Sequence, residues 1–255
     1  MLPSDATSFY DEFSESYDGF VAWKSRLKNE SPFFRKLFRR NRVRRVLDVA
    51  CGTGKHAIAL MQQGYEVVGA DVSEGMIRRA RENAAAAGLA ADFVVAGFGQ
   101  LRYSVGGQFD AIVCLGNSLP HLLSEESLAE ALADIRAVLR QGGLFVTQNL
   151  NFDKIWREKD RFMPVSPWRA RGKQMLFFRF LDFDASLLTF NVVSMTEEKG
   201  QWSYSVRSTN WRPIFKVDLE RLLRQAGFDD LSFFADYQEK PWSPDATRDL
   251  IVVAK

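Results

Sequence analysis

The chain has 255 residues, of which 46% are hydrophobic and 26% are charged, and its formal charge is +2 at pH 7. This composition excludes a disordered, collagen-like or coiled-coil protein, and the balanced charge requires no polyanionic partner. The two cysteines, Cys51 and Cys114, are too few for a disulfide framework or a four-cysteine zinc site.

The chain begins with acidic residues and lacks the basic and apolar segments of a signal peptide. No later apolar run approaches the about 20 residues that cross a bilayer, so we expect a soluble cytoplasmic protein without a membrane partner. Residues 8–40 predict helices, because their aromatic and leucine side chains recur at helical spacing, and Ser31-Pro32 is expected to end one helix and begin the next. We treat residues 1–42 as a helical cap on a main domain, residues 43–255.

Apolar strands then alternate with helices. Strands are predicted at about 45–49, 66–70, 92–96, 109–115 and 144–150, helices at about 56–63, 73–87, 125–140 and 216–226, and two final strands at about 232–237 and 250–254. This alternation predicts an α/β fold in which helices cover both faces of the sheet. We expect a Rossmann-like, doubly wound, mostly parallel sheet of seven strands.

The pattern changes in the segment from about residue 151 to residue 215. Residues 162–171 contain Pro164 and Pro167 and are expected to form a loop. Three strand-like stretches with short connectors follow, at about 174–183, 187–196 and 202–212, and they predict an antiparallel β meander. We interpret the segment as an insertion between a strand and its crossover helix, which forms a lid or platform over the main site.

A glycine turn joins the first strand of the main domain to its helix, at Val46–Gly54. Its spacing does not match a P-loop, but Gly52–Ala57 matches the GxGxxA pattern of dinucleotide sites, so the glycines alone leave a dehydrogenase possible. Asp48 favours another ligand, because a carboxylate there repels a pyrophosphate and suits the ammonium and sulfonium of S-adenosylmethionine. Asp71 ends the next strand, where an acidic side chain can accept hydrogen bonds from both hydroxyls of a ribose.

Four motifs in order resemble those of the class I S-adenosylmethionine-dependent methyltransferases. VLDVACGTGKHAIAL is similar to the first motif of that family, GADVSEGMI to the second, FDAIVCLGNSLPHL to the fourth and LRQGGLFV to the fifth. The resemblance covers about residues 43–150. Within the family, Leu115–His121 is most similar to glycine and sarcosine N-methyltransferases, and the antiparallel insertion resembles that of aminosugar N-methyltransferases.

The resemblance implies S-adenosylmethionine as cofactor and a set of residues around it. The implied cofactor contacts are Tyr17, Arg26, Asp48, Ala50, Gly52, Gly54, Asp71, Val72, Met76, Gly97, Phe98, Leu115, Asn117 and Ser118. Among them, Arg26 is implied to hold the cofactor carboxylate, and Tyr17, together with Tyr10, to close over the cofactor. Many members carry an acidic residue near Gly97, where this chain has none.

The candidate catalytic residues lie on loops at the carboxyl ends of strands: Asn117, His121 and Asn149. Methyl transfer from a sulfonium is an in-line displacement, so the enzyme supplies mainly alignment and desolvation. His121 is either an acceptor for a proton near neutral pH or a structural imidazole. His56 is expected to be solvated in the first turn of a helix, and neither histidine has a second ligand nearby that implies a metal site.

The sequence departs from that of the glycine methyltransferases at one position that would bind the substrate. Leu150 takes the place of the arginine that in those enzymes holds the carboxylate of the amino acid, so a carboxylate would need Arg171, Arg179 or Arg212. We therefore predict methylation of a small molecule, more at nitrogen than at oxygen, and leave the substrate open.

Three other functions remain as alternatives. The basic cluster at residues 35–45 would serve an RNA methyltransferase, but its simpler interpretation is a solvated helix end, and the chain lacks the NPPY-type tetrapeptide of amino-methylating nucleic-acid enzymes. We therefore do not expect a nucleic-acid partner. A non-catalytic S-adenosylmethionine-binding module and an NAD-dependent dehydrogenase are the others. The sequence does not specify an oligomeric state.

Overall fold

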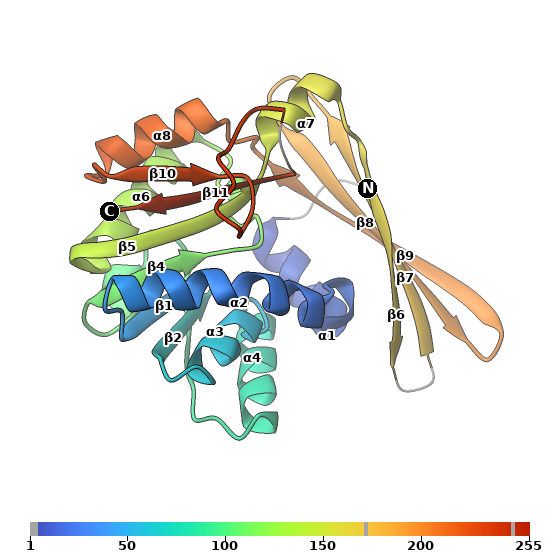
Figure 1. Cartoon of the computed structure of the whole chain (residues 1–255). Helices are drawn as coiled ribbons and strands as arrows, with labels where there is room; N and C mark the ends of the chain where they lie inside the picture. The colour runs from blue at the N-terminus through green and yellow to red at the C-terminus, as the bar shows by residue number, and fades with distance from the viewer. Residues whose placement is uncertain (1–4, 171–172, 246–247) are drawn as a thin grey trace.

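The chain folds around two β-sheets in a computed structural model that describes residues 5–170, 173–245 and 248–255 (Figure 1). The larger sheet has seven strands in the order β10-β11-β5-β4-β1-β2-β3, and the smaller has four in the order β6-β7-β8-β9. No helix in these ranges is both long and apolar enough to cross a membrane.

Five strands of the larger sheet run parallel: β1 (Arg45–Val49), β2 (Glu66–Asp71), β3 (Asp92–Val95), β4 (Phe109–Cys114) and β5 (Leu139–Leu150). The other two complete one edge antiparallel: β11 (Asp249–Ala254) pairs with β5, and β10 (Leu231–Phe234) with β11. This arrangement confirms the predicted Rossmann-like α/β fold. The strand order reverses between β1 and β4, and a sheet of this kind binds its ligand outside the carboxyl ends at that point.

Helices α2 (Trp23–Arg40), α3 (Lys55–Met61) and α4 (Glu74–Ala86) cover one face of the larger sheet, and α5 (Leu101–Ser104), α6 (Glu125–Val138) and α8 (Lys216–Gln225) cover the other. The remaining described helices are α1 (Ala6–Phe20), α7 (Phe152–Glu158) and the 3-10 turn η1 (Leu119–His121). Side chains alternate across a strand, so β1 supplies Leu47 to the core under α6 and α8 and Val46 to the core under α2, α3 and α4. Three short elements, η1, α5 and α7, were not predicted, because none is long enough to show a clear helical period. Helix α3 is as short as α7, but Gly54 and Gly64 mark its two ends.

The break in the N-terminal cap was predicted at Ser31-Pro32, and this prediction is wrong. The break lies at Val21 and Ala22, and α2 continues through Pro32. A proline inside a helix costs about 3 kcal/mol. The turn that follows buries Phe33 and Phe34, and burial of about 2 kcal/mol for each phenylalanine offsets that cost.

The smaller sheet contains the three strands of the predicted antiparallel meander, β7 (Lys173–Phe183), β8 (Leu188–Glu198) and β9 (Gln201–Trp211), and a fourth strand that was not predicted, β6 (Phe162–Ala170). All four strands together are called the meander below. It lies between β5 and α8 in the chain. The expectation of a loop at residues 162–171 is wrong, because most of that stretch is strand β6. Pro164 and Pro167 are tolerated there since β6 is an edge strand, and its register shifts between Met163 and Ser166. Arg171 lies outside the described residues.

One face of the meander packs against α1 and α7. Phe177 and Phe190 of the meander join Phe9 and Phe13 of α1 and Phe152 of α7 in a third core cluster. Figure 1 shows the meander as a wall beside the larger sheet, with α1 between them. The space at the carboxyl ends of β1, β4 and β5 is therefore enclosed by α1 and by this wall.

Candidate active site

Two adjoining pockets open at the carboxyl ends of the central strands. The Asp71 pocket, of about 270 Å³, lies over β1 and β2, and the Arg179 pocket, of about 430 Å³, lies between β5, α2 and the meander. Tyr10 and Tyr17 of α1 line both of them. A ligand that fills one pocket therefore reaches the other at these two rings.

The glycine turn and Asp71 form the floor of the Asp71 pocket. Ala50 and Gly52 adopt left-handed backbone conformations, with φ of 55° and 54°. The Gly52 amide donates to Asp71 Oδ2 over 2.8 Å and the Ser73 amide to Oδ1 over 2.9 Å. Burial raises the pKa of Asp71, although these two bonds oppose the shift. The carboxylate is thereby fixed at the pocket with lone pairs left for a ligand.

The walls of the Asp71 pocket are apolar. Val72 and Met76 follow β2, and Phe98 follows β3. The Gln100 side chain accepts from the Gly97 amide over 2.9 Å, which leaves its own amide group at the pocket. A flat, weakly polar ring fits between these walls, next to a carboxylate that can bind sugar hydroxyls.

Helix α1 is fastened over this pocket by two acidic side chains. Asp11 Oδ1 accepts from the Ser73 hydroxyl over 2.5 Å and from the Gly75 amide over 2.9 Å. Asp18 Oδ1 accepts from the Thr53 hydroxyl over 2.6 Å. The cap is thus hydrogen-bonded to both loops that form the pocket.

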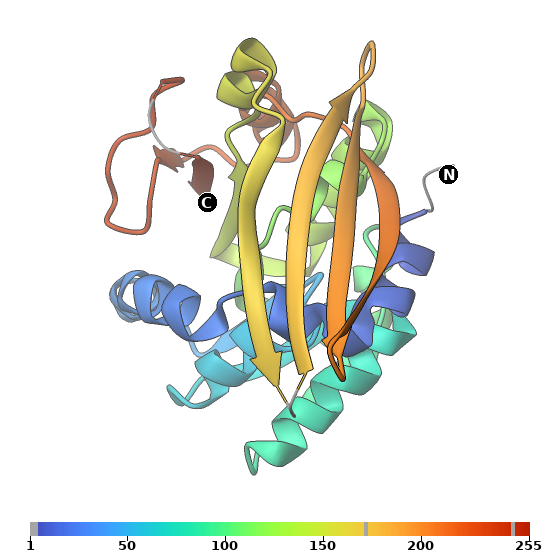
Figure 2. The same cartoon turned by 90° about the vertical axis from the view of Figure 1, so that its right-hand side faces the viewer.

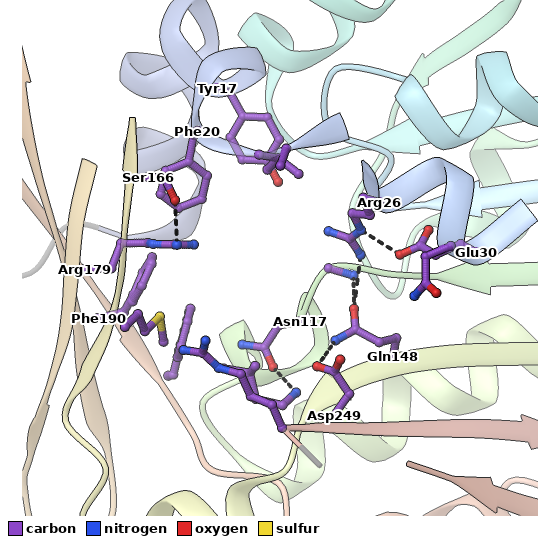
Figure 3. A pocket seen from close by; sticks show the side chains of 18 of the residues that line it. Tyr17, Phe20, Arg26, Glu30, Asn117, Gln148, Ser166, Arg179, Phe190 and Asp249 are labelled. Atoms are coloured by element: carbon purple, nitrogen blue, oxygen red, sulfur yellow. Dashed lines mark hydrogen bonds and ion pairs between the residues drawn. The ribbon is translucent and has the colours of Figure 1, made fainter. Parts of the chain in front are cut away.

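Arg26 lies on the opposite side of the Arg179 pocket from Arg179 (Figure 3). Its Nε donates to Glu30 Oε1 over 2.7 Å and its Nη2 to Gln148 Oε1 over 3.2 Å. The same Gln148 oxygen accepts from the Gly116 amide over 2.9 Å. The guanidinium is therefore held beside the loop after β4, where it can also bind a ligand carboxylate.

A buried histidine supports this arrangement. His56 Nε2 lies 2.7 Å from Glu30 Oε2, and His56 is only 7% exposed, so the expectation that it is solvated is wrong. Burial alone would raise the pKa of Glu30, but its bonds to His56 and Arg26 outweigh this and hold the pKa below its usual value. Glu30 therefore stays ionised as the counter-charge of Arg26.

Arg179 has no such counter-charge. Its Nη2 donates to Ser166 Oγ over 2.9 Å and to the Pro164 carbonyl over 3.1 Å, and its guanidinium lies 4.9 Å from the centre of the Phe20 ring. None of its contacts within the described part of the chain is a carboxylate. Burial lowers the pKa of Arg179, and the neighbouring charge of Arg248 lowers it further. Arg179 and Arg248 both line this pocket, and within the described residues Arg179 is not paired with a carboxylate.

His121 joins three separate segments. The Trp211 indole donates to His121 Nε2 over 3.1 Å, and the Tyr10 hydroxyl lies 3.0 Å from the same atom. Because an indole N–H only donates, Nε2 is the acceptor and the ring proton lies on Nδ1. Burial lowers the pKa of His121 to about 4. The imidazole is neutral at physiological pH and holds Tyr10 and the meander against the loop after β4.

The pockets gather most of the predicted residues. The Asp71 pocket is lined by Tyr17, Ala50, Gly52, Asp71, Val72, Met76, Gly97, Phe98, Ser118 and the candidate catalytic residue His121, and the Arg179 pocket by Tyr17, Arg26 and Asn117. Asn117 accepts from the Leu150 amide over 2.9 Å, while its Nδ2 is buried and has no protein partner within the described ranges. That amide is available to a ligand.

Four predicted residues line neither pocket: Asp48, Gly54, Leu115 and Asn149. Asp48 accepts from the Ala57 amide over 3.1 Å and so fastens β1 to α3, and burial raises its pKa to about 8. Asn149 points to the other face of β5, where its amide donates to the Thr147 hydroxyl over 3.2 Å.

The remaining two of the four, Gly54 and Leu115, shape the loops beside the pockets. A side chain at Gly54 would place its Cβ 2.8 Å from the Phe93 ring, so this glycine permits close packing of the turn on β3. The Leu115 carbonyl accepts from the Ser118 hydroxyl over 3.1 Å.

Several pocket residues were not predicted: Gln100, Gln148, Arg248 and Asp249. Gln148 adjoins the predicted Asn149, and the strict alternation of β5 would have selected it once the facing side of the strand was known. For the other three the sequence carries no local signal. Within the described ranges, no group of three or more His, Cys, Asp or Glu side chains is arranged to hold a metal ion.

Comparison with known proteins identifies relatives of this chain. A family model described as "Methyltransferase domain" matches residues 46–143. The glycine/sarcosine N-methyltransferase of Parasynechococcus marenigrum (strain WH8102) is 30% identical over 242 residues, which cover 93% of this chain and 81% of the relative. That of Aphanothece halophytica is 30% identical over 232 residues, which cover 91% and 83%.

Solved structures share the fold. An S-adenosylmethionine-dependent methyltransferase from Clostridium acetobutylicum ATCC 824 superposes with a TM-score of 0.78 at 18% identity, covering 96% of this chain and 98% of the other. DesVI of Streptomyces venezuelae gives a TM-score of 0.76 at 19% identity and covers 99% of both chains. Together with the relatives of similar sequence, these matches show that the chain belongs to the class I S-adenosylmethionine-dependent methyltransferases.

Proposed function

We propose that the protein transfers the methyl group of S-adenosylmethionine to an amine nitrogen of a small molecule. The observation that carries the proposal is the junction of the two pockets at Tyr10 and Tyr17, which lets a cofactor seated in the Asp71 pocket extend its methionine part into the Arg179 pocket and meet a substrate there. The names of the relatives, glycine/sarcosine N-methyltransferases, support nitrogen as the acceptor.

The residues fit the cofactor in three places. Asp71 would accept from the ribose hydroxyls, and the apolar walls around Val72 and Met76 would hold the adenine. Arg26 would bind the carboxylate of the methionine part, and the free Nδ2 of Asn117 lies on the same side of the pocket. Asp48 and Asn149 have no part in this proposal, because both side chains point elsewhere.

The bound cofactor supplies a methyl group on a sulfonium, which is already a good leaving group. The protein then has to align the amine and exclude water. Tyr10 and Tyr17 restrict the passage between the pockets, and His121 holds the Tyr10 hydroxyl. His121 is a positioning residue in this scheme, because its low pKa makes it a poor base at neutral pH. An amine that binds in its neutral form needs no base for the attack and loses its proton afterwards to solvent.

The substrate carries an acidic group in addition to its amine. Arg179 is a half-buried cation that contacts no carboxylate among the described residues, and it lies across the pocket from Arg26. Arg212 already pairs with Glu125 at 3.5 Å, and Leu150 cannot bind an anion. Arg179 is therefore our candidate for the group that replaces the missing arginine.

Methyl transfer to matched amines tests the proposal. Radiolabelled S-adenosylmethionine is incubated with glycine, sarcosine and larger amino acids, and in parallel with their carboxamides. Methylation of the acids that exceeds that of the amides supports both the reaction and the acidic group. Equal rates would contradict the acidic group of the substrate but not the methyl transfer itself. If RNA is added to the same assay and is labelled while the amines are not, the RNA alternative is favoured.

The RNA alternative has little support. The basic cluster of residues 35–45 lies at the end of α2 and the start of β1, and none of its residues lines either pocket. Two of its cations are already paired, Arg45 with Glu66 and Lys36 with Glu239.

A further inference from the structure

The four strands of the meander present a second face, which points away from the active site. Side chains alternate along each strand, so Arg179 and Phe190 face the Arg179 pocket while Phe178 and Phe180 face outward. Figure 2 views this outer face directly, and no described helix or strand crosses in front of it. The inner face is buried by α1 and α7, but no described part of the chain packs on the outer face.

The centre of this outer face is apolar, and a hydrogen-bonded polar group of Asp182, Asn191 and Ser208 lies toward one end of it. Phe162 is 59% exposed, Trp202 49% and Tyr204 76%, although each lies within a strand. Phe162 stacks on Phe178 with ring centres 5.9 Å apart, and Phe178 lies 5.6 Å from Phe180. These rings form one continuous aromatic surface across β6 and β7.

The middle of the outer face is apolar and uncharged. By register, Leu176 and Phe178 of β7 lie beside Met195 and Val193 of β8, and Tyr204 of β9 lies beside Met195.

The charged side chains of the described outer face stand near the strand ends: Arg169, Asp182 and Glu197. Arg169 is hydrogen-bonded to Gln174, and Asp182 is paired with Arg161. The face therefore offers an apolar centre inside a polar border, which is the anatomy of a protein interface. It lacks the positive charge that nucleic acid or an anionic membrane would need.

The size of the face corresponds to a dimer contact. Its strands have 9 to 11 residues. At about 3.3 Å for each residue and about 4.8 Å between strands, the sheet covers roughly 600 Å² in projection. A standard stable interface buries roughly 800 Å² on each partner. The accessible area of the face is larger than its projected area, because its side chains protrude, and so approaches that value.

We propose that this outer face packs against the same face of a second copy of the chain. A two-fold contact brings one patch against itself, so an uncharged, apolar patch is complementary to its own copy without any further partner. Two such sheets would stack about 10 Å apart with their side chains interdigitated. This inference does not depend on the proposed reaction.

The contact would also stabilise the active site. Phe178 and Phe180 flank Arg179 on the same strand, so the surface that meets the second copy and the wall of the Arg179 pocket are two faces of one sheet. Pairing of the outer faces restrains the strand that carries Arg179.

Analytical ultracentrifugation of the full chain tests the contact. We expect the wild-type protein to sediment as a dimer in the micromolar range. Tyr204→Arg places an unpaired charge in the contact and should raise the dimer dissociation constant at least tenfold. Because Tyr204 is 76% exposed, the substitution leaves the fold intact, which circular dichroism and the affinity for S-adenosylhomocysteine verify. Trp202→Arg is a second variant with the same expected result.

Tyr103→Arg is the matched control. Tyr103 lies on α5, far from the meander in the chain, and is 83% exposed, so the same change of residue type there should leave the dimer intact. A monomeric wild-type protein would overturn the proposal. So would an assembly that both Tyr204→Arg and Trp202→Arg leave unchanged, or one that Tyr103→Arg weakens equally.

Discussion

The Trp211 indole donates a hydrogen bond to His121 Nε2 over 3.1 Å and thereby fastens the last strand of the meander to the loop after β4. The two residues are 90 positions apart in the chain. The same nitrogen lies 3.0 Å from the Tyr10 hydroxyl, so the cap, the central sheet and the insertion meet at one imidazole. The position of Tyr10 between the two pockets thus depends on His121 being neutral.

Protonation of His121 should destabilise the fold. The pKa of His121 is lowered to about 4 in the folded state, against about 6.5 in an unfolded chain, so the unfolded chain binds the proton more tightly. Stability is therefore complete above pH 6.5 and is lost as the pH falls toward 4, by about 3 kcal/mol from this group.

Chemical denaturation at several pH values measures this loss. Between pH 6.5 and 4 the free energy of unfolding should decrease less in His121→Asn than in the wild type, and the difference should be about 3 kcal/mol. Lys24→Asn, a change at an exposed position of α2, controls for the loss of a titratable group. Parallel curves for the wild type and His121→Asn would contradict the assignment.

Asp71→Ala should weaken the binding of S-adenosylmethionine at least tenfold, because it removes the acceptor of the ribose hydroxyls and leaves the Gly52 and Ser73 amides without their partner. Isothermal titration calorimetry measures the effect. Asp92→Ala, at an exposed position at the start of β3, should bind as the wild type does. An unchanged dissociation constant in Asp71→Ala would exclude the ribose assignment.

Arg179→Gln should raise the KM for an acidic amine about tenfold or more while the affinity for S-adenosylmethionine stays within about twofold of the wild type, since a charge-assisted hydrogen bond to the substrate is lost. Arg161→Gln is the matched control, because Arg161 is exposed and lies outside both pockets. A fall in cofactor affinity with an unchanged KM would assign Arg179 to the cofactor instead.

Arg26→Met should lower the affinity for S-adenosylmethionine at least tenfold, because the side chain that would bind the cofactor carboxylate is gone and Glu30 keeps only His56 as a partner. The variant is compared with Arg26→Lys, which keeps the positive charge but cannot make the bidentate contact of a guanidinium. Its affinity for S-adenosylmethionine should lie between those of the wild type and Arg26→Met. Equal affinity in all three proteins would contradict the role of Arg26.

Local chemistry explains which parts of the site the sequence predicts. The glycine turn and Asp71 depend on residues within one strand-turn-helix unit, so their identity and spacing are sufficient. Asn149 was predicted to lie at the site, but its neighbour Gln148 lines the pocket instead. Both are amides on one strand, and only the packing of the sheet determines which face of that strand meets the pocket. The pairing of His121 with Trp211 depends on the insertion packing back on the core, which no local pattern encodes.

The fold shows the same division. Alternating strands and helices predicted the larger sheet, since each unit buries its own apolar face. Two predictions that relied on prolines were wrong. Pro32 was expected to break a helix that tertiary burial preserves, and Pro164 to exclude a strand that is tolerated at a sheet edge. In each case a contact distant in sequence outweighed a local preference.

Calorimetric titration of the purified protein with S-adenosylmethionine, S-adenosylhomocysteine and NAD tests the central claim most directly. The account predicts micromolar binding of both adenosyl sulfur ligands and no heat from NAD. Binding of NAD without either of the others would contradict it and would identify the glycine turn as a dinucleotide site.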